Sequence, residues 1–207
     1  MTVTDLPGAT LRTVHVSAMD NACYLLTCSA SGSQLLIDAA DDTPALLSLV
    51  NDGSARLDVV VTTHRHWDHH RALPAVVAET GARTAAGADD ADELPVTVDE
   101  RLSHGDTVVV GDLSLDVVHL RGHTPGSVAL IWRDADGGTH AFTGDSLFPG
   151  GVGKTTSPET FTSLLDDVTA RLFDVLPDST LVYPGHGAGT TLGAERPSLP
   201  EWRSRGW

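Results

Sequence analysis

The sequence predicts an α+β fold in which two β-sheets pack against each other and helices cover their outer faces. Two observations support this fold class: strand-like segments gather in two halves of the chain, and each half continues into helical segments. The chain has 207 residues, 41% of them hydrophobic, which is enough for one larger core. We therefore expect a single domain over residues 1–207.

Strands are expected where β-branched and apolar residues run between turn-forming stretches. The first half contains the expected strands 11–15, 22–28, 34–38 and 57–62. The second half contains the expected strands 106–110, 113–119, 127–132, 140–143 and 180–183. The run 57–62 is rich in valine, which is typical of a strand that is buried on both faces.

Three helices are expected, followed by an end without regular structure. Thr43 and Pro44 predict the N-cap and first turn of a helix that continues to residue 50. The segments 71–80 and 157–175 are the other expected helices. Residues 193–207 lack a periodic apolar pattern, so we expect an irregular C-terminal tail there.

The charge balance excludes several classes of partner. Asp and Glu outnumber Lys and Arg 28 to 13, and the resulting net charge of −15 would repel a phosphate backbone. No apolar stretch approaches the length that spans a bilayer, and the first residues lack the pattern of a secretion signal. We expect a cytoplasmic protein that binds neither nucleic acid nor membrane; its oligomeric state is left open.

One segment of six residues contains four candidate metal ligands. His64, His66 and Asp68 alternate directly after the valine-rich strand, so in an extended backbone their side chains project to one side. His69 follows as the chain turns. A single histidine would most simply be a surface residue, but four such side chains in six residues predict a metal site.

Three further candidates stand in glycine-lined loops after other expected strands: His123, Asp145 and His186. Together with the cluster they provide five histidines and two aspartates, which are enough for two divalent metal ions. Imidazole and carboxylate ligands suit Zn²⁺, and also Fe or Mn. Because no thiolate belongs to the set, an open catalytic site is favoured over a closed structural one.

The remaining histidines lack such a setting, and we assign them to surface, turn or core positions: His15, His70, His104, His119 and His140. His70 adjoins the cluster, so a supporting role behind the ligands is open for it.

The combined motifs resemble those of the metallo-β-lactamase fold superfamily. They lie at 64–69, 122–127, 143–148 and 183–186, within a resemblance that covers roughly residues 10–190. The fold implied is a four-layer αββα sandwich. Within the superfamily, Gly-Asp-Ser-Leu-Phe followed by Gly-Gly-Val-Gly-Lys is similar to the pattern of glyoxalase II, which hydrolyses hydroxyacyl thioesters.

The resemblance implies two groups of metal ligands that share one carboxylate. The first group is His64, His66 and His123. The second group is Asp68, His69 and His186. The shared, bridging residue is Asp145.

Three aspartates have further implied roles. Asp38 matches a family aspartate near the site and would orient a ligand from behind, although structural capping explains it about as well. Two divalent ions with two aspartates leave the site positive, so a water between them would ionise near neutral pH and attack a carbonyl carbon. Asp68 and Asp145 are therefore the expected catalytic residues, with Asp68 helping to manage protons.

The sequence departs from the glyoxalase II pattern on the thiol-binding side. Ala188 and Thr156 stand where that group has aromatic residues, and the 21 residues after His186 do not match its helical region that grips glutathione. Lys154, the only lysine, is retained. We expect Lys154 to bind an anionic group of the substrate, while glutathione, mycothiol and coenzyme A all stay open as carriers.

The leading hypothesis is therefore a binuclear hydrolase of a small thioester. A lactone is the nearest rival substrate because it presents the same electrophilic carbonyl. A different class, the persulfide dioxygenases, resembles the chain in fold and histidines but uses a single iron. Metal content separates that class from the hydrolases.

Overall fold

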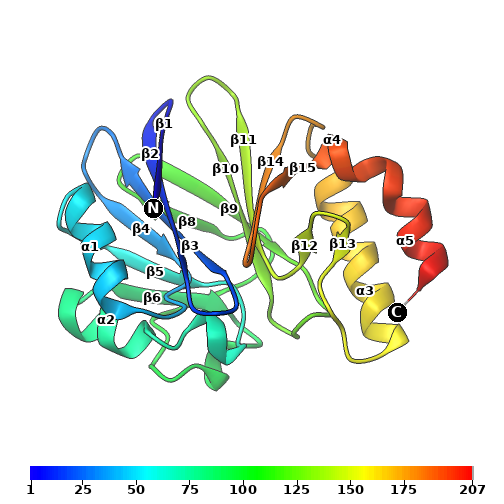
Figure 1. The fold of residues 1–207 in the computed structure, drawn as a ribbon, viewed down its shortest axis with the longest axis horizontal. Helices are drawn as coiled ribbons and strands as arrows, with labels where there is room; N and C mark the ends of the chain where they lie inside the picture. Colours follow the sequence, from blue (N-terminus) through cyan, green and yellow to red (C-terminus); the bar gives the residue numbers. More distant parts are fainter. Residues whose placement is uncertain (207) are drawn as a thin grey trace.

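The computed structural model describes residues 1–206 and contains two β-sheets packed face to face, with helices on both outer sides (Figure 1). The first sheet contains, in spatial order, β1 (Thr2–Leu6), β2 (Ala9–Val16), β3 (Asn21–Cys28), β4 (Gln34–Ile37), β5 (Val59–Thr62), β6 (Arg83–Gly87) and β7 (Glu100–Leu102). Its first four strands are antiparallel, and β4 to β7 are parallel.

The second sheet contains, in spatial order, β15 (Thr190–Thr191), β14 (Leu181–Pro184), β11 (Thr139–Gly144), β10 (Val128–Arg133), β9 (Leu113–His119) and β8 (Thr107–Val110). Its strands are antiparallel except for the pair β11 and β14, which is parallel. A short two-stranded ribbon, β12 (Leu147–Phe148) with β13 (Gly151–Val152), follows β11.

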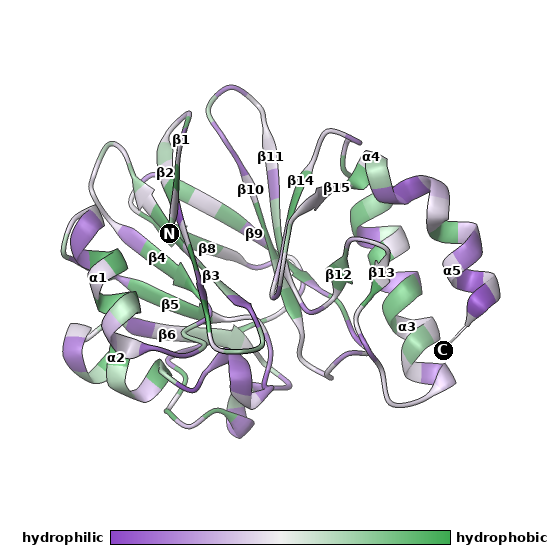
Figure 2. Cartoon of the chain, in the orientation of Figure 1, coloured by the Kyte–Doolittle hydropathy of each residue, from purple (hydrophilic) through white to green (hydrophobic). Residues whose placement is uncertain are grey.

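Three apolar layers hold these elements together. The layer between the sheets combines residues such as Leu26 and Val61 from one sheet with Leu115 and Phe142 from the other. Because successive strand residues point to opposite faces, the neighbours of these residues face the helices. Figure 2 shows the result as hydrophobic residues concentrated along the strands, with hydrophilic and hydrophobic residues alternating along the helices.

The helices complete the outer layers. Leu46 of α1 (Thr43–Gly53) and Leu73 of α2 (Leu73–Thr80) pack on the first sheet. On the second sheet lie α3 (Pro158–Val168), α4 (Leu192–Glu195) and α5 (Leu199–Arg205), through buried residues such as Leu164, Leu192 and Trp202. The expected four-layer αββα arrangement is confirmed. Within residues 1–206, no helix combines the length and apolar character needed to cross a bilayer.

The predicted strands are found, but six others escaped the sequence pattern: β1, β6, β7 and the two-residue strands β12, β13 and β15. β1 is an edge strand whose residues are largely exposed, so it has no apolar alternation. β6 is buried, but two of its five residues are alanine, and only Thr84 is β-branched. β7 has three residues. Tertiary pairing rather than local propensity makes these segments strands.

The helix ends differ by a few residues from the prediction. The first helix is capped by Asp42 instead of Thr43: the Asp42 carboxylate accepts the backbone N–H of Ala45 at 3.2 Å. This helix continues to Gly53. The helix expected at 157–175 is regular only to Val168 and continues as a π-helical turn, Thr169–Phe173.

The expectation of an irregular tail over 193–207 is wrong for most of that segment. α4, a 3-10 turn (Arg196–Ser198) and α5 follow one another, while residue 207 lies outside the described residues. Leu192 and Trp202 are the only apolar residues of these short helices that are buried. Because these two positions are ten residues apart, they form no recognisable helical period in the sequence.

The buried Trp202 gives a test of how the end of the chain packs. Its side chain is 2% exposed and lies 6.3 Å from the ring of Phe173. Trp202→Ala should lower the free energy of unfolding by about 3–5 kcal/mol, because it leaves a cavity in the layer beside α3. Urea unfolding followed by circular dichroism measures this. Val175→Ala, at a 65% exposed position, is the control and should change stability by less than about 0.5 kcal/mol. Equal midpoints for the two variants would contradict this packing.

Candidate metal centre

The candidate ligands lie where the two sheets are joined by backbone hydrogen bonds. The N–H of Val128 donates to the carbonyl of Thr63 at 2.9 Å, which ties the strand before His64 to the strand after His123. The N–H of Gly185 donates to Gly144 O, and Ala22 N–H donates to Gly185 O, both at 2.8 Å. Because β11 and β14 are parallel, Asp145 and His186 leave the sheet at the same edge.

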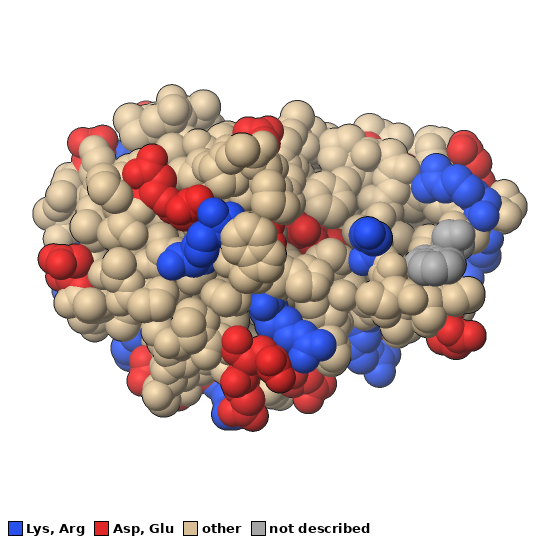
Figure 3. Space-filling view, turned by 60° about the horizontal axis from the view of Figure 1, so that its bottom comes forward, with Lys and Arg blue, Asp and Glu red and all other residues tan. Residues whose placement is uncertain are grey.

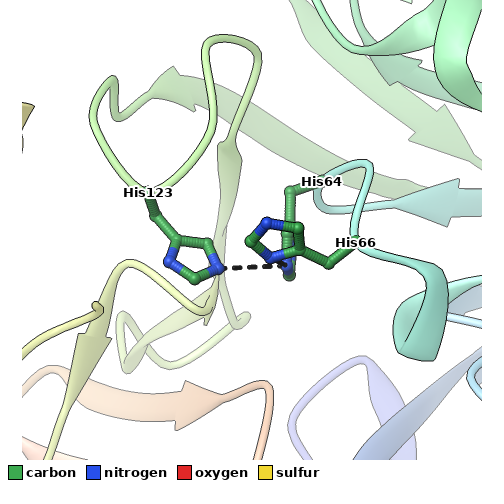
Figure 4. Close-up of side chains that lie close together, drawn as sticks. All are labelled: His64, His66 and His123. Atoms are coloured by element: carbon green, nitrogen blue, oxygen red, sulfur yellow. Dashed lines mark hydrogen bonds between the residues drawn. The ribbon is translucent and has the colours of Figure 1, made fainter. Parts of the chain in front are cut away.

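The first group is formed by His64, His66 and His123. Figure 4 shows His123, on the loop after β9, pointing toward the two histidines that follow β5. His64 Nε2 lies 3.1 Å from His66 Nδ1 and 3.3 Å from His123 Nε2. His64 is fully buried, whereas His66 is exposed at the edge of the group.

The second group is formed by Asp68, His69 and His186. Asp68 and His69 belong to a 3-10 turn, Trp67–His69, which turns both side chains inward. His69 Nε2 lies 3.1 Å from His186 Nε2, and Asp68 Oδ2 lies 3.3 Å from the same His186 atom.

Asp145 lies between the two groups. Its Oδ1 is 3.4 Å from His69 Nε2, and its Oδ2 is 3.5 Å from the Nε2 atoms of both His123 and His186. The structure therefore brings all seven predicted ligands together, with the carboxylate of Asp145 in contact with both groups.

Four of the imidazoles are oriented from behind by hydrogen bonds at Nδ1. His69 Nδ1 lies 2.8 Å from Asp38 Oδ2. The Nδ1 atoms of His123 and His186 lie 2.6 Å and 2.8 Å from the carbonyl oxygens of Lys154 and Met19. A carbonyl or carboxylate oxygen can only accept, so these Nδ1 atoms carry the protons.

The fourth imidazole, that of His64, is oriented by the hydroxyl group of Thr63. The Thr63 hydroxyl donates to Asp38 Oδ2 at 2.9 Å, and its oxygen lies 3.1 Å from His64 Nδ1. Since the hydroxyl proton is directed at Asp38, Thr63 accepts from His64. Asp38 thus orients one histidine of each group.

This hydrogen-bond pattern fits divalent metal ions. When Nδ1 carries the proton, a neutral ring presents a lone pair at Nε2, and pairs of Nε2 atoms face each other at 3.1 Å and 3.3 Å. Lone pairs at that distance repel unless a proton or a metal ion lies between them. Burial lowers the pKa of His69, but the carboxylates of Asp38 and Asp145 outweigh burial and raise this pKa to about 10, so a proton occupies the His69 position when no metal ion is bound. In addition, Asp145 Oδ1 is buried and has no hydrogen-bond partner within residues 1–206. Imidazole nitrogens with carboxylate oxygens form a donor set suited to zinc or iron.

The close packing of charged groups shifts their pKa values. Burial raises the pKa of Asp145, but contacts with His186 and His69 outweigh burial and hold it well below its usual range. Burial, together with the neighbouring imidazoles of His69 and His123, lowers the pKa of His64. Asp145 is therefore ionised and His64 is neutral near pH 7, which are the states that bind metal.

Two glycines allow the loops to approach Asp145. A Cβ atom on Gly153 would lie 1.7 Å from the Asp145 carbonyl oxygen, and one on Gly185 would lie 2.2 Å from Asp145 Oδ1. A side chain at Gly185 would displace the carboxylate between the groups, and one at Gly153 would displace the backbone that carries it.

Two residues at the site were not identified from the sequence. Thr63 links Asp38 to His64, and Asn21, which is fully buried, donates from Nδ2 to Asp68 Oδ2 at 2.9 Å. The position of Thr63 next to the cluster was an available signal. No signal in the sequence pointed to Asn21, because Asn21 begins a strand 47 residues before Asp68 and the two residues are in contact only in the folded chain.

The other predicted residues lie around the centre. The Lys154 side chain is exposed, and its carbonyl contacts His123. His70 Nε2 lies 3.0 Å from the carbonyl of Arg65, so it supports the backbone of the cluster. His140 is buried between Tyr183 and Asp134 in the core. None of these side chains belongs to a candidate ligand group within residues 1–206.

Comparison with known proteins defines the class. The metallo-beta-lactamase superfamily matches residues 18–186, and the chain belongs to this superfamily. Two similar curated proteins are named hydroxyacylglutathione hydrolase: one from Fuscovulum blasticum is 39% identical and one from Jannaschia sp. is 37% identical. Each alignment covers 81% of this chain and 62% of the relative, so the chain spans less than two thirds of the length of these relatives.

Two similar solved structures are each 30% identical to this chain. ETHE1 from Myxococcus xanthus superposes with a TM-score of 0.81 over 94% of this chain and 84% of its own. TTHA1623, solved in a di-iron-bound form, superposes with a TM-score of 0.72 over 89% of this chain and 96% of its own.

Asp38 gives a test of the centre that does not alter a candidate ligand. Asp38→Asn should weaken zinc binding about 10- to 100-fold, because it removes the carboxylate that orients His69 and, through Thr63, His64. Competition with a chromophoric chelator measures the affinity. Asp41→Asn is the control, since Asp41 pairs with the partly exposed Arg71 at 2.8 Å. Unchanged zinc affinity in Asp38→Asn would show that Asp38 does not organise the ligands.

Proposed function

We propose that this chain is a binuclear metal-dependent hydrolase that cleaves a thioester of a small thiol carrier. The observation that carries the proposal is the pair of donor groups in contact with one carboxylate, Asp145. The relatives named hydroxyacylglutathione hydrolase support the thioester as the substrate class.

In this proposal, His64, His66 and His123 would hold one metal ion, and Asp68, His69 and His186 would hold the other. Asp145, which contacts both groups, would contribute to both ions. When bound, the two ions would supply Lewis acidity that lowers the pKa of a water and polarises the substrate carbonyl. The second donor group favours two ions over the single iron of a persulfide dioxygenase.

The side chains of the chain have defined tasks in this reaction. Asp68, held by Asn21 at 2.9 Å, faces His186 and can accept a proton from the attacking water. Asp145, ionised because its pKa is lowered, keeps the two imidazole groups at a fixed separation. A thiolate is a stable leaving group, so no general acid is needed to protonate the departing sulfur. A lactone lacks that advantage and is the second candidate substrate.

Metal content and turnover together test the function. Zinc-loaded protein should contain about two metal ions per chain and should release thiol from a hydroxyacyl thioester, because both donor groups are complete. Atomic emission and a thiol-reactive dye measure these quantities. Asp145→Ala should lose metal and turnover together. The proposal is overturned by one iron per chain with oxygen uptake on a persulfide, or by hydrolysis of lactones without any thioester.

Lys154 is proposed to bind an anionic group of the substrate. Lys154→Ala should raise KM for an anionic thioester roughly two- to fivefold and leave KM for a neutral one unchanged, because an exposed charge contact is lost. Steady-state kinetics on the two substrates provides the measurement. Lys154→Arg retains the charge and serves as the control. Equal effects on both substrates would mean that the ammonium group does not contact substrate.

A further inference from the structure

A second fully buried aspartate, Asp90, lies beside the first donor group. It is 0% exposed and lies on the turn that follows β6. Most charged side chains of the chain lie at the surface, and Figure 3 shows acidic and basic groups spread over one face of the molecule. A carboxylate that is shielded from water is costly unless hydrogen-bond donors surround it. The partners of Asp90 therefore indicate what its burial achieves.

Neither helix capping nor an ion pair accounts for the buried carboxylate. Asp90 is the N-cap residue of a 3-10 turn, Ala91–Glu93, but its side chain makes no capping hydrogen bond. An aspartate at an N-cap usually accepts a backbone N–H from the first turn of its own helix. The nearest cation is the guanidinium of Arg65, whose Nε atom is 3.7 Å away and thus beyond hydrogen-bond distance. The hydrogen bonds of Asp90 lead instead to two other loops.

On one side, Asp90 holds the segment that contains two candidate ligands. Its Oδ2 atom accepts the backbone N–H of Arg65 at 3.0 Å. Arg65 lies between His64 and His66, which both belong to the first donor group. This hydrogen bond therefore fixes the backbone from which both imidazoles extend.

On the other side, Asp90 holds the loop of the third ligand, His123. The Thr124 hydroxyl donates to Asp90 Oδ2 at 2.5 Å, and the Gly126 N–H donates to Asp90 Oδ1 at 2.9 Å. The Thr124 hydroxyl oxygen also lies 2.6 Å from Ser127 Oγ. Thr124 and Ser127 are both buried, so these hydrogen bonds are not exposed to competing water. One carboxylate thus joins the two parts of the chain that provide the first donor group.

Two glycines provide the space for this contact. A Cβ atom on Gly126 would lie 2.4 Å from Asp90 N, and one on Gly87 would lie 1.9 Å from Gly126 O. A side chain at either position would push the turn after β6 away from the loop after β9. The close approach of the two loops is therefore a property of the backbone, and the carboxylate of Asp90 fixes it.

The contacts of Asp90 belong to one donor group only. Its hydrogen bonds end at residues next to the ligands of the first group, and within residues 1–206 none of them reaches a ligand of the second group. Asp38 differs in this respect, because it orients one histidine of each group. The two buried aspartates should therefore have different effects on the two metal ions.

We propose that Asp90 is a positioning residue for the first donor group, because it holds the His123 loop against the segment of His64 and His66. This inference rests on the two metal ions of the proposed function and adds the residue that sets the affinity for one of them. Without the carboxylate, the His123 loop can move away from the other two ligands. The second group keeps all its contacts, so the affinity for only one metal ion should fall.

Zinc affinity of the full-length protein tests this role without any substrate. Asp90→Asn retains the size of the side chain, but in either orientation its NH2 group faces a backbone N–H, that of Arg65 or that of Gly126. One zinc ion should bind about 10- to 100-fold more weakly, and the other should keep its affinity within about twofold. Competition with a chromophoric chelator measures both dissociation constants. Asp89→Asn, at the exposed neighbouring position, is the matched control and should change neither constant.

Cobalt identifies the donor group that is affected. In the protein loaded with Co²⁺, proton NMR detects the ring N–H signals of the ligating histidines at strongly shifted positions. Asp90→Asn should change the signals of the first donor group and leave those of the second group in place. The variants His66→Ala and His186→Ala each remove one ligand of one group, and they assign the signals.

Two variants at Thr124 test the same contact if Asp90→Asn does not fold. Thr124→Val removes only the hydroxyl and should weaken the binding of the same zinc ion about three- to fivefold. Thr124→Ser retains the hydroxyl and should bind both ions as the wild-type protein does. Urea unfolding of the metal-free variants measures their stability separately from their zinc affinity.

The proposal is overturned if Asp90→Asn weakens the binding of both zinc ions equally, since Asp90 would then serve the fold as a whole. Unchanged affinity for both ions would also overturn it, whatever the urea midpoint, and so would a change confined to the cobalt signals of the second group. The proposed function fails in a different way. If two ions are bound but no thioester is cleaved, the zinc constants of Asp90→Asn still decide whether Asp90 positions the first group.

Discussion

The buried carboxylate of Asp38 is the interaction on which the rest of the centre depends. It is 1% exposed and accepts three hydrogen bonds, from Thr63 N, the Thr63 hydroxyl and His69. A buried carboxylate is costly without such partners, so its presence forces the strand end and the 3-10 turn into one arrangement. Through His69 directly and His64 by way of Thr63, this single group sets one imidazole in each donor group.

The position of Asp38 explains why the centre lies at the junction of the sheets. Asp38 follows β4 and has a left-handed backbone, with φ of 60°. Its N–H donates to Val61 O at 2.9 Å, so it remains attached to β5 as the chain leaves the sheet. The second sheet then supplies Asp145 and His186 from two parallel strands. Neither sheet alone contains a complete donor group, since His123 completes one group and His186 the other.

How much of the fold and of the candidate metal centre could be predicted depends on whether each feature is determined by neighbouring residues or by residues far apart in the sequence. The spacing of His64, His66, Asp68 and His69 is local, and a buried strand followed by a turn determines where those side chains point. The glycine-lined loops of His123, Asp145 and His186 were recognised for the same reason. The layers followed from apolar runs long enough to show a period. Local patterns were therefore sufficient for two packed sheets with outer helices and for the seven candidate side chains, whereas the division of these side chains into two groups came from the resemblance to the superfamily.

Features that depend on distant parts of the chain could not be predicted in this way. Asn21 contacts Asp68 only because β3 begins beside His186, where an isolated bridge joins Asn21 and His186. β6 is a strand because it pairs with β5, although its own residues have little strand propensity. The helices at the end of the chain are held by a few anchors on α3 and its continuation. In each case a tertiary contact supplies what the local sequence lacks.

The charge beside the centre differs from that of the chain as a whole. The chain as a whole carries excess negative charge, so an anionic molecule is repelled at long range. Screening in physiological salt limits that repulsion to about 8 Å, so only the charges nearest to the centre act on a molecule that has reached it. Arg65 is attached to the same short segment as His64 and His66. A segment that fixes two candidate ligands therefore also fixes a cation beside them.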